Sequence, residues 1–323
     1  MEVFNSNKIY PFMQKRFAFM GLSAFLFIGS LFLIMTKGLN FGIDFTGGTL
    51  VQIQYEQKAP IEDIRKILTQ IEKFKSANVT KFGSDNEIVI RIPTSSTSIT
   101  KDIGDEIRLA LKSTGNFDVR RVDMVGPKVG DALKEKGLMA LTLSLIIILI
   151  YVSLRFEWRF ALTSVLALVH DVTITIGFLV LFNVDINLDI LAALLTLLGY
   201  SINDTIIVFD RIREGLTNSK ETELTKVIDE SVSNTLSRTT LTSLTTFFVI
   251  LTLFIFGGEI IYGFSFALLV GIIVGTYSSI FVAAPLLIQF KFSIVDYRNN
   301  LALKEKEKKE KERIRAQFEQ GTV

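Results

Sequence analysis

Asp204 lies in an apolar stretch of the chain, where a charged side chain is costly. The stretch begins near Ile190 and reads ILAALLTLLGYSIND, and dense charge returns only at Asp210, Arg211 and Arg213. At a helical rise of about 1.5 Å per residue, Asp204 lies roughly 9 Å inside that boundary. An ionised side chain there costs about 3 kcal/mol on insertion scales. Such a carboxylate is expected either to exchange protons or to serve as a structural clamp.

Several neighbours of Asp204 could share its chemistry. Arg238 opens the next apolar stretch at a depth that we expect to be similar, so an Asp204–Arg238 ion pair would offset part of the burial cost of each side chain. Asn203 precedes the carboxylate directly. A run of hydroxyls that begins with Thr239 and Thr240 follows the arginine. These hydroxyls either bond their own backbone carbonyls or line a hydrated path to Asp204, and we favour the path.

His170 and Asp171 form a second polar pair, about 15 Å from either end of the third apolar stretch. A lone histidine is usually a hydrogen-bonded packing residue. At the centre of a bilayer and beside an aspartate, a proton relay or a polar contact between spans is an equally good interpretation. The sequence leaves both open.

The elements that must position these residues are membrane spans. Of the 323 residues, 49% are hydrophobic, and the mean hydropathy is +0.42. The absence of cysteine excludes a disulfide framework and any thiolate metal site, and the single histidine excludes a histidine-rich one. The predicted divisions are an N-terminal segment at 1–16, a first span at 17–36, an outer domain at 37–137, five further spans within 138–290 with a polar loop at 210–237, and a charged tail at 291–323.

Residues 37–137 alternate between strand and helix patterns in the order βαββαβ, which is typical of a ferredoxin-like α+β unit. The fold class is therefore an all-α bundle of six spans with an external α+β domain between spans 1 and 2. Lysine and arginine gather in the two terminal segments and in 155–159 and 210–237, which places both termini in the cytoplasm. Gly271 and Gly275 form a GxxxG motif that predicts close helix packing. The tail is expected to be a solvated segment, with contact to the ribosome or to anionic lipid as the alternative.

Six motifs together resemble the SecF family of the bacterial Sec protein-export machinery. They read GIDFTGGTLVQ, VGPKVG, LRFEWRFAL, HDV, GYSINDTIIVFDRIRE and SRTTLTSLTT, in that order between residues 42 and 246. In that family the aspartate of SIND and the arginine of SRTT are implicated in proton conduction, and they correspond here to Asp204 and Arg238.

The resemblance implies a subunit of the RND superfamily in the bacterial cytoplasmic (inner) membrane. It implies pairing with SecD, association with the SecYEG channel, SecA and YajC, and an exported polypeptide as substrate. The proton gradient would be the energy source for late steps of export, with no cofactor, no metal and no nucleic-acid partner. A passive scaffold that stabilises SecD or the channel is an alternative. An intramembrane aspartyl protease built on Asp171 and Asp204 is a weaker one, because the chain has SIND in place of the GxGD motif of such enzymes. We therefore expect no enzymatic activity.

Overall fold

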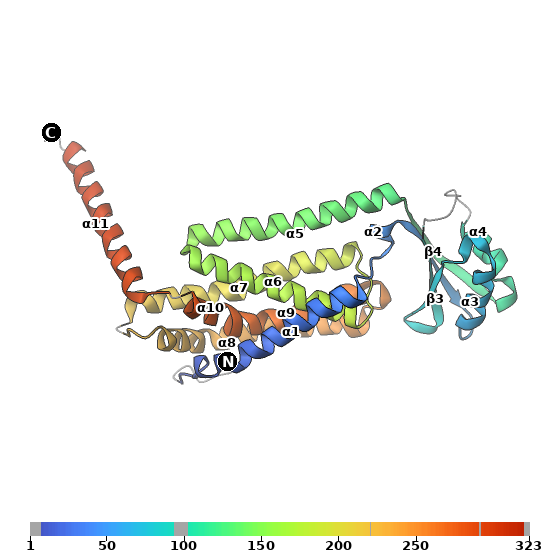
Figure 1. Ribbon diagram of the computed structural model, residues 1–323, viewed down its shortest axis with the longest axis horizontal. Helices are drawn as coiled ribbons and strands as arrows, with labels where there is room; N and C mark the ends of the chain where they lie inside the picture. Colours follow the sequence, from blue (N-terminus) through green and yellow to red (C-terminus); the bar gives the residue numbers. More distant parts are fainter. Residues whose placement is uncertain (1–7, 94–102, 220, 291, 320–323) are drawn as a thin grey trace.

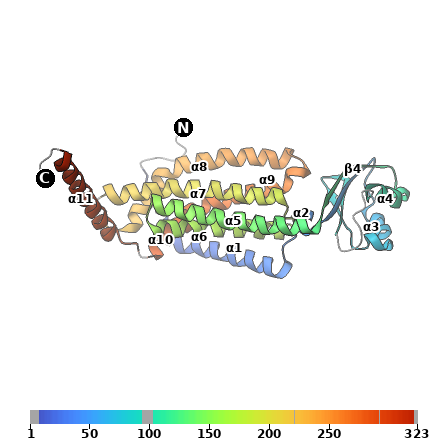
Figure 2. The ribbon, with the colours of Figure 1, turned by 90° about the horizontal axis from the view of Figure 1, so that it is seen from above.

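The computed structural model describes residues 8–93, 103–219, 221–290 and 292–319. Long helices lie side by side in a bundle, a small α+β domain stands at one end of it, and the last helix projects from the other end (Figures 1 and 2). Within the described residues, six helices are long and apolar enough to cross a membrane. The fold class is therefore the predicted one, a six-span helical protein with a domain inserted after the first span.

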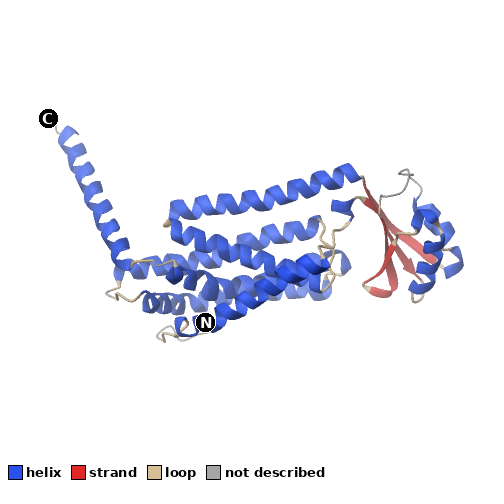
Figure 3. Cartoon of the chain, viewed as in Figure 1, coloured by secondary structure: helices blue, strands red, loops and turns tan. Residues whose placement is uncertain are grey.

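The small domain has the predicted βαββαβ order. Its elements are β1 Gly48–Tyr55, α3 Ile61–Gln70, β2 Asn78–Phe82, β3 Ser84–Ile92, α4 Ile103–Ala110 and β4 Phe117–Val125, with 3-10 turns at Glu72–Phe74 and Lys112–Thr114. The strands form one antiparallel sheet in the order β2-β3-β1-β4. Both helices cover the face of the sheet that points away from the bundle (Figure 3). The start of the predicted second helix, at 99–102, lies outside the described residues.

Alternation along the strands builds the core of this domain. Val51 and Ile53 on β1 and Ile88 and Ile90 on β3 are fully buried, and they pack against Ile64 of α3. Successive strand residues point to opposite faces, so these apolar side chains all reach the helix-covered face. The domain is therefore a packed unit of its own, held to the bundle at its other face.

The bundle is formed by α1 Arg16–Lys37, α5 Pro127–Arg155, α6 Trp158–Leu181, α7 Leu188–Asn218, α8 Leu224–Phe256, and the sixth span, which runs as α9 Glu259–Ser278, a π-helical turn Ser279–Ala283 and α10 Ala284–Gln289. Of the most apolar part of each span, 72% is buried in the sixth and 56% in α6, against 11% in α1, α5 and α8. The sixth span and α6 therefore lie at the centre, while α1, α5 and α8 leave apolar faces uncovered.

Several helices extend beyond the predicted apolar stretches. The helix α5 begins at Pro127, so residues 127–137 continue the second span rather than the external domain. The polar loop predicted at 210–237 is mostly helical as well, because α7 and α8 extend into it from both sides. The charged tail forms α11 Ile294–Glu319, and a 3-10 turn, η1 Met13–Lys15, precedes α1.

The chain passes between bundle and domain through one compact junction. It leaves α1, makes the short helix α2 Ile43–Thr46, and turns through Gly47 and Gly48 into β1. Both glycines have positive φ, +70° and +138°, and a Cβ on Gly48 would lie 2.6 Å from the Ile92 carbonyl oxygen. Only glycine accepts this conformation at no steric cost. The return path, β4 into α5, passes the same place, since a Cβ on Gly130 of α5 would lie 2.9 Å from the Gly47 nitrogen.

Candidate functional site

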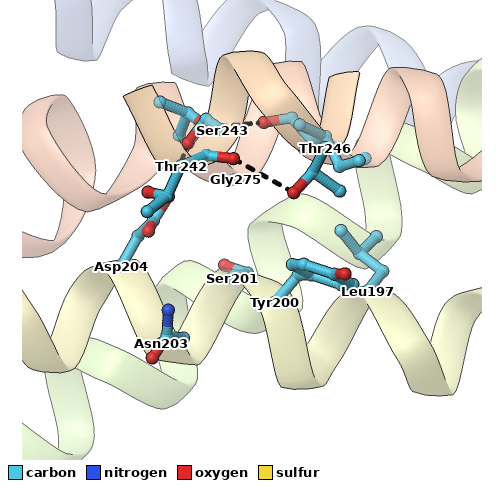
Figure 4. A pocket seen from close by; sticks show the side chains of 12 residues that line it. Leu197, Tyr200, Ser201, Asn203, Asp204, Thr242, Ser243, Thr246 and Gly275 are labelled. Carbon is cyan, nitrogen blue, oxygen red and sulfur yellow. Dashed lines mark hydrogen bonds between the residues drawn. The ribbon is translucent and has the colours of Figure 1, made fainter. Parts of the chain in front are cut away.

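Asp204 lies on α7 at the meeting point of three helices. Its side chain is buried (8% exposed), and its Oδ2 accepts a hydrogen bond of 3.0 Å from the Ser243 hydroxyl on α8. Thr276 on α9 in turn donates its hydroxyl to Ser243 Oγ over 2.8 Å. A chain of hydroxyls therefore joins the carboxylate to both neighbouring helices (Figure 4).

A small cavity of about 50 Å³ lies in front of this carboxylate. Its lining residues come from α7, α8 and α9 and are Leu197, Tyr200, Ser201, Asn203, Asp204, Thr242, Ser243, Thr246, Gly271, Ile272, Gly275 and Thr276. A space of this size with several polar side chains in its lining has room for one or a few water molecules. Asn203 thus borders the cavity beside Asp204, as a polar residue of the predicted hydrated face would.

The predicted ion pair between Asp204 and Arg238 is wrong for this chain. Arg238 is exposed, and its side chain makes no hydrogen bond or ion pair with any residue that the structure describes. The reason is helical geometry, because Arg238 precedes Ser243, which does face Asp204, by five residues. Five residues correspond to about 140° around α8 and about 7.5 Å along it. The arginine therefore lies on another face of the same helix.

Some hydroxyls of the run after Arg238 bond backbone carbonyls of their own helix, and others face Asp204 or its cavity. Thr242, Thr245 and Thr246 donate to backbone carbonyls one turn earlier on α8, which is the inert behaviour. Ser243 alone among these hydroxyls bonds Asp204 in the described structure. Thr242 and Thr246 still line the cavity with their side chains.

Thr239 and Thr240, which the sequence also singled out, do not line the cavity. Thr239 is buried, and its hydroxyl has no hydrogen-bond partner among the described residues. Thr240 is half-buried. The part of the predicted hydrated path that the structure contains therefore begins at Thr242.

His170 and Asp171 form a second buried cluster, on α6. Asp171 is fully buried (0% exposed), and its Oδ1 lies 2.9 Å from His170 Nδ1. Its Oδ2 accepts hydrogen bonds from Ser201 on α7 over 2.5 Å and from Ser278 on α9 over 2.8 Å. His170 stacks on Phe27 of α1, and its Nε2 has no partner among the described residues. The polar contact between spans therefore forms, and it joins three helices.

Ser201 connects the two clusters. Its hydroxyl donates to Asp171, and the same residue lines the cavity in front of Asp204. The two carboxylates have no hydrogen-bond partner in common, so they do not form the paired dyad of an aspartyl protease. Nor does any group of three or more His, Asp or Glu in the described chain come close enough to hold a metal ion.

Four hydroxyl residues complete the clusters, namely Ser201, Ser243, Thr276 and Ser278. Ser243 belongs to the predicted hydroxyl run and Ser201 to the small and polar face expected around Asp204, but sequence reasoning missed Thr276 and Ser278. A signal for these two was present, because Thr276 directly follows the GxxxG glycine Gly275 and Ser278 lies three residues beyond it. A π-helical turn begins immediately after Ser278, and such turns in otherwise regular helices often mark functional positions.

The GxxxG motif brings these groups within reach, as predicted. A Cβ on Gly271 would lie 2.6 Å from Leu197 Cδ1, and one on Gly275 would lie 3.1 Å from Ser201 Cβ. Bare backbone on α9 thus lets it approach α7 closely, at the two positions that flank the cavity. The packing residues and the polar residues occupy the same interface.

The chain is similar to known proteins. Residues 106–293 match the family described as "Protein export membrane protein SecD/SecF, C-terminal", and residues 32–59 match the "SecD/SecF GG Motif". The "Protein translocase subunit SecF" of Helicobacter pylori is 48% identical over 100% of both chains. That of Vibrio alginolyticus is 46% identical over 88% of this chain and 91% of its own.

Solved structures agree. The crystal structure of SecDF, described as a translocon-associated membrane protein, from Thermus thermophilus superposes with a TM-score of 0.82 at 34% identity. The match covers 90% of this chain and 40% of that longer one. A second SecDF structure, in a form called super-membrane-facing, gives a TM-score of 0.64 at 33% identity, over 94% and 40% of the two chains. Because the family match spans more than half of the sequence and the Helicobacter pylori relative matches it along its whole length, the chain belongs to the SecF family of protein translocase subunits.

Proposed function

We propose that this chain works with SecD in the bacterial cytoplasmic membrane, where the pair uses the proton gradient to promote late steps of protein export. The observation that carries the proposal is Asp204, a buried carboxylate with hydroxyl partners, a small cavity in front of it and no cation beside it in the described structure. The exported polypeptide is the substrate, and SecYEG, SecA and YajC are the further partners. We assign no catalytic residue.

The site suits proton binding because of what surrounds the carboxylate. Ionised, Asp204 would carry a charge within a membrane span with only the neutral hydroxyls of Ser243 and Thr276 against it among the described residues. A charge at such depth costs about 3 kcal/mol, and protonation removes that cost. The cavity of about 50 Å³ provides a place for the water that delivers the proton. The packing of α7 against α8 and α9 therefore depends on whether the proton is bound.

Arg238 has a place in this proposal as a residue that faces a partner. It is exposed on α8, a helix that leaves most of its apolar surface uncovered in the chain by itself. A cation on such a face needs an acidic or polar partner from another chain. The solved SecDF chain is longer than this one, which covers 40% of it, so the remaining length has room for the second half that supplies such a group. In the assembled pair we expect Arg238 to face SecD from α8 and to take part in proton coupling there.

His170 and Asp171 extend the proton path in this proposal. A hydrogen-bonded series leads from the cavity through Ser201 to Asp171 and then to His170. A buried imidazole with one free ring nitrogen takes up or releases a proton without moving its other bond. We therefore assign His170 and Asp171 a role as a proton relay. The contacts of Asp171 with α7 and α9 hold the pair in place.

The energy available matches the task. One proton that crosses about 100 mV releases roughly 2.3 kcal/mol, which shifts a two-state equilibrium roughly fifty-fold. Proton binding at Asp204 would let the two six-span halves rock against each other, as in other transporters built from repeats. The external domain then moves relative to the membrane and draws the emerging polypeptide outward or prevents it from sliding back. Both termini stay cytoplasmic in this arrangement.

Asp204→Asn tests the proposal against the scaffold alternative. In inverted vesicles that contain SecD and this chain, the variant is expected to lose the part of export that depends on the proton gradient and to keep normal assembly with SecD. Deletion of the chain should abolish both. A passive scaffold tolerates the point change, so full gradient-dependent export from Asp204→Asn would refute the proposed function.

A further inference from the structure

The start of α7 is held by a residue from a distant part of the chain. Asp44 Oδ2 accepts a hydrogen bond of 3.0 Å from the backbone nitrogen of Leu188, the first residue of α7. Asp44 belongs to the short helix α2, at the entrance to the external domain. The first N–H groups of a helix have no partner within it, and the positive end of the helix dipole favours a carboxylate there. Asp44 supplies both needs.

The helix also has a cap within its own segment, so the bond from Asp44 is an addition to the usual local capping. Asn187 Oδ1 accepts from the Ile190 nitrogen over 2.9 Å, the usual way in which a preceding side chain caps a helix. Asp189 adds a negative charge in the first turn without a hydrogen bond to another described residue. The hydrogen bond from Leu188 to Asp44 connects α7 to the segment that leads into the sheet.

Further contacts restrain the connection between α2 and the start of α7. The Gly42 nitrogen donates to the Ile186 carbonyl over 2.7 Å, and the Ile186 nitrogen donates to the Asn40 carbonyl over 2.6 Å. On the other side of α2, Gly130 of α5 approaches Gly47 so closely that a side chain would not fit. The short helix α2 is thus clamped between the start of α7, the start of α5 and the first residue of β1.

From this geometry we infer that Asp44 is a positioning residue that couples α7 to the external domain. Leu188 and Asp204 lie on the same uninterrupted helix, sixteen residues and about 24 Å apart. A rigid helix carries a shift at Asp204 to its N-terminal end, where Asp44 passes it to α2 and β1. The inference rests on the proposed function, because it names the connection by which proton binding would move the domain.

Because the chain has no cysteine of its own, two introduced thiols are the only sites at which it can be labelled. Leu109→Cys on α4 and Phe256→Cys at the end of α8 are exposed positions on the domain and on the bundle (74% and 81% exposed). Spin labels at the two sites, in the full chain assembled with SecD in lipid nanodiscs, give the distribution of distances between domain and bundle. The measurement is made with Asp204 and with Asp204→Asn, which mimics the protonated state.

The expected result is a shift of the distance distribution on Asp204→Asn that Asp44→Ala abolishes. Asp44→Asn, whose amide oxygen still accepts a hydrogen bond, should restore the shift. Gradient-dependent export should fall at least fivefold in Asp44→Ala and recover in Asp44→Asn. Asn187→Ala is the matched control, since it removes a cap from the same helix end. It should speed amide exchange in the first turn of α7 about fivefold, the usual effect of one lost cap, and leave the shift in place.

Two outcomes separate the inference from the function on which it rests. A shift that persists in Asp44→Ala overturns the coupling role of Asp44 and leaves the proposed function standing. The absence of any shift between Asp204 and Asp204→Asn, together with full export from Asp204→Asn, overturns both. A loss of the shift in Asn187→Ala equal to that in Asp44→Ala also contradicts the inference, because helix capping alone would then explain the effect.

Discussion

The Ser243 hydroxyl donates to the Asp204 carboxylate over 3.0 Å, across the interface of α8 and α7. Thr276 on α9 donates to the same Ser243 oxygen, so one hydroxyl ties the carboxylate to two helices at once. In a membrane-spanning interface, such a bond contributes to helix association as well as to the solvation of the carboxylate. Protonation of Asp204 at Oδ2 would turn this oxygen from an acceptor into a donor. A change in the charge of Asp204 therefore alters, through Ser243, the contacts that α8 makes with α7 and α9.

Ser243→Ala is expected to reduce gradient-dependent export severalfold, because the ionised carboxylate loses its hydroxyl donor. A hydrogen bond to a charged group contributes about 1.5–3 kcal/mol. Thr245→Ala is the matched control, since Thr245 lies on the same helix and donates only to its own backbone. Export measured in vesicles at a fixed gradient compares the two. Equal activity in both variants would show that the Ser243 contact is irrelevant to coupling.

Asp171→Asn distinguishes a relay from a structural contact at the second cluster. The asparagine keeps an acceptor for Ser201 and Ser278, so we expect normal assembly but a loss of gradient-dependent export. Asp171→Leu removes the acceptor and should also lower the free energy of unfolding, by about 1–3 kcal/mol for the buried hydroxyls left without it. Chemical denaturation in detergent measures the second effect. Wild-type export from Asp171→Asn would reduce this cluster to a structural role.

Gly271→Val should force α9 away from α7, since even a Cβ at this position would lie 2.6 Å from Leu197 Cδ1. The expected cost is about 1–3 kcal/mol of unfolding free energy, with a parallel loss of export. Gly199→Ala on α7 serves as the control, because a Cβ there meets no atom within 4 Å. It should be neutral or slightly stabilising. If both variants had the same stability as the wild type, the close-packing role of the GxxxG motif would have to be abandoned.

The external domain also docks through an ion pair between Arg91 on β3 and Asp185 in the turn between α6 and α7. Burial raises the pKa of the Asp185 carboxyl, and the Arg91 guanidinium opposes that rise without cancelling it. When the domain lifts, the carboxyl returns to water and to its ordinary pKa. The docked form therefore binds the proton more tightly than the lifted form. The contribution of this group to docking is complete below the ordinary aspartate pKa and is lost as pH rises through the raised value.

Amide exchange of Gly42 and Ile186, corrected for its intrinsic pH dependence, measures this docking. Protection should increase on acidification, and Asp185→Asn should remove the pH dependence. Arg91→Ala leaves the carboxylate without its cation and should weaken docking at neutral pH by about 0.2–1 kcal/mol, the range for partly exposed pairs. Protection that rises with pH would contradict the assignment.

The architecture was predictable because its signals are local. Runs of apolar residues define six spans, and the alternation in 37–137 defines the sheet, so both appear in the structure at nearly the expected places. The GxxxG packing followed from the same kind of local pattern. Helix ends were less predictable, because the polar turns at 127–137 continue the helix of the second span beyond the point at which hydropathy changes.

The contacts of the site were harder to predict, since they depend on rotation about a helix axis. Arg238 was expected beside Asp204 on the grounds of depth alone, whereas Ser243, five residues later, faces the carboxylate. The tie between Asp44 and Leu188 joins residues 144 positions apart, and no periodicity in the sequence points to it. Position along a span can be estimated from one sequence, but which side chains face each other across helices needs coordinates.

The most direct test of the central claim is an infrared difference spectrum of the chain assembled with SecD in lipid, recorded as the external pH is stepped. If Asp204 binds and releases a proton, a carboxylic C=O band should appear on acidification, be absent in Asp204→Asn, and persist in Ser243→Ala with an altered frequency. Asp171→Asn serves as the control for the other buried carboxyl. A spectrum in which Asp204→Asn removes no titrating band would contradict the claim that this carboxylate couples proton movement to protein export.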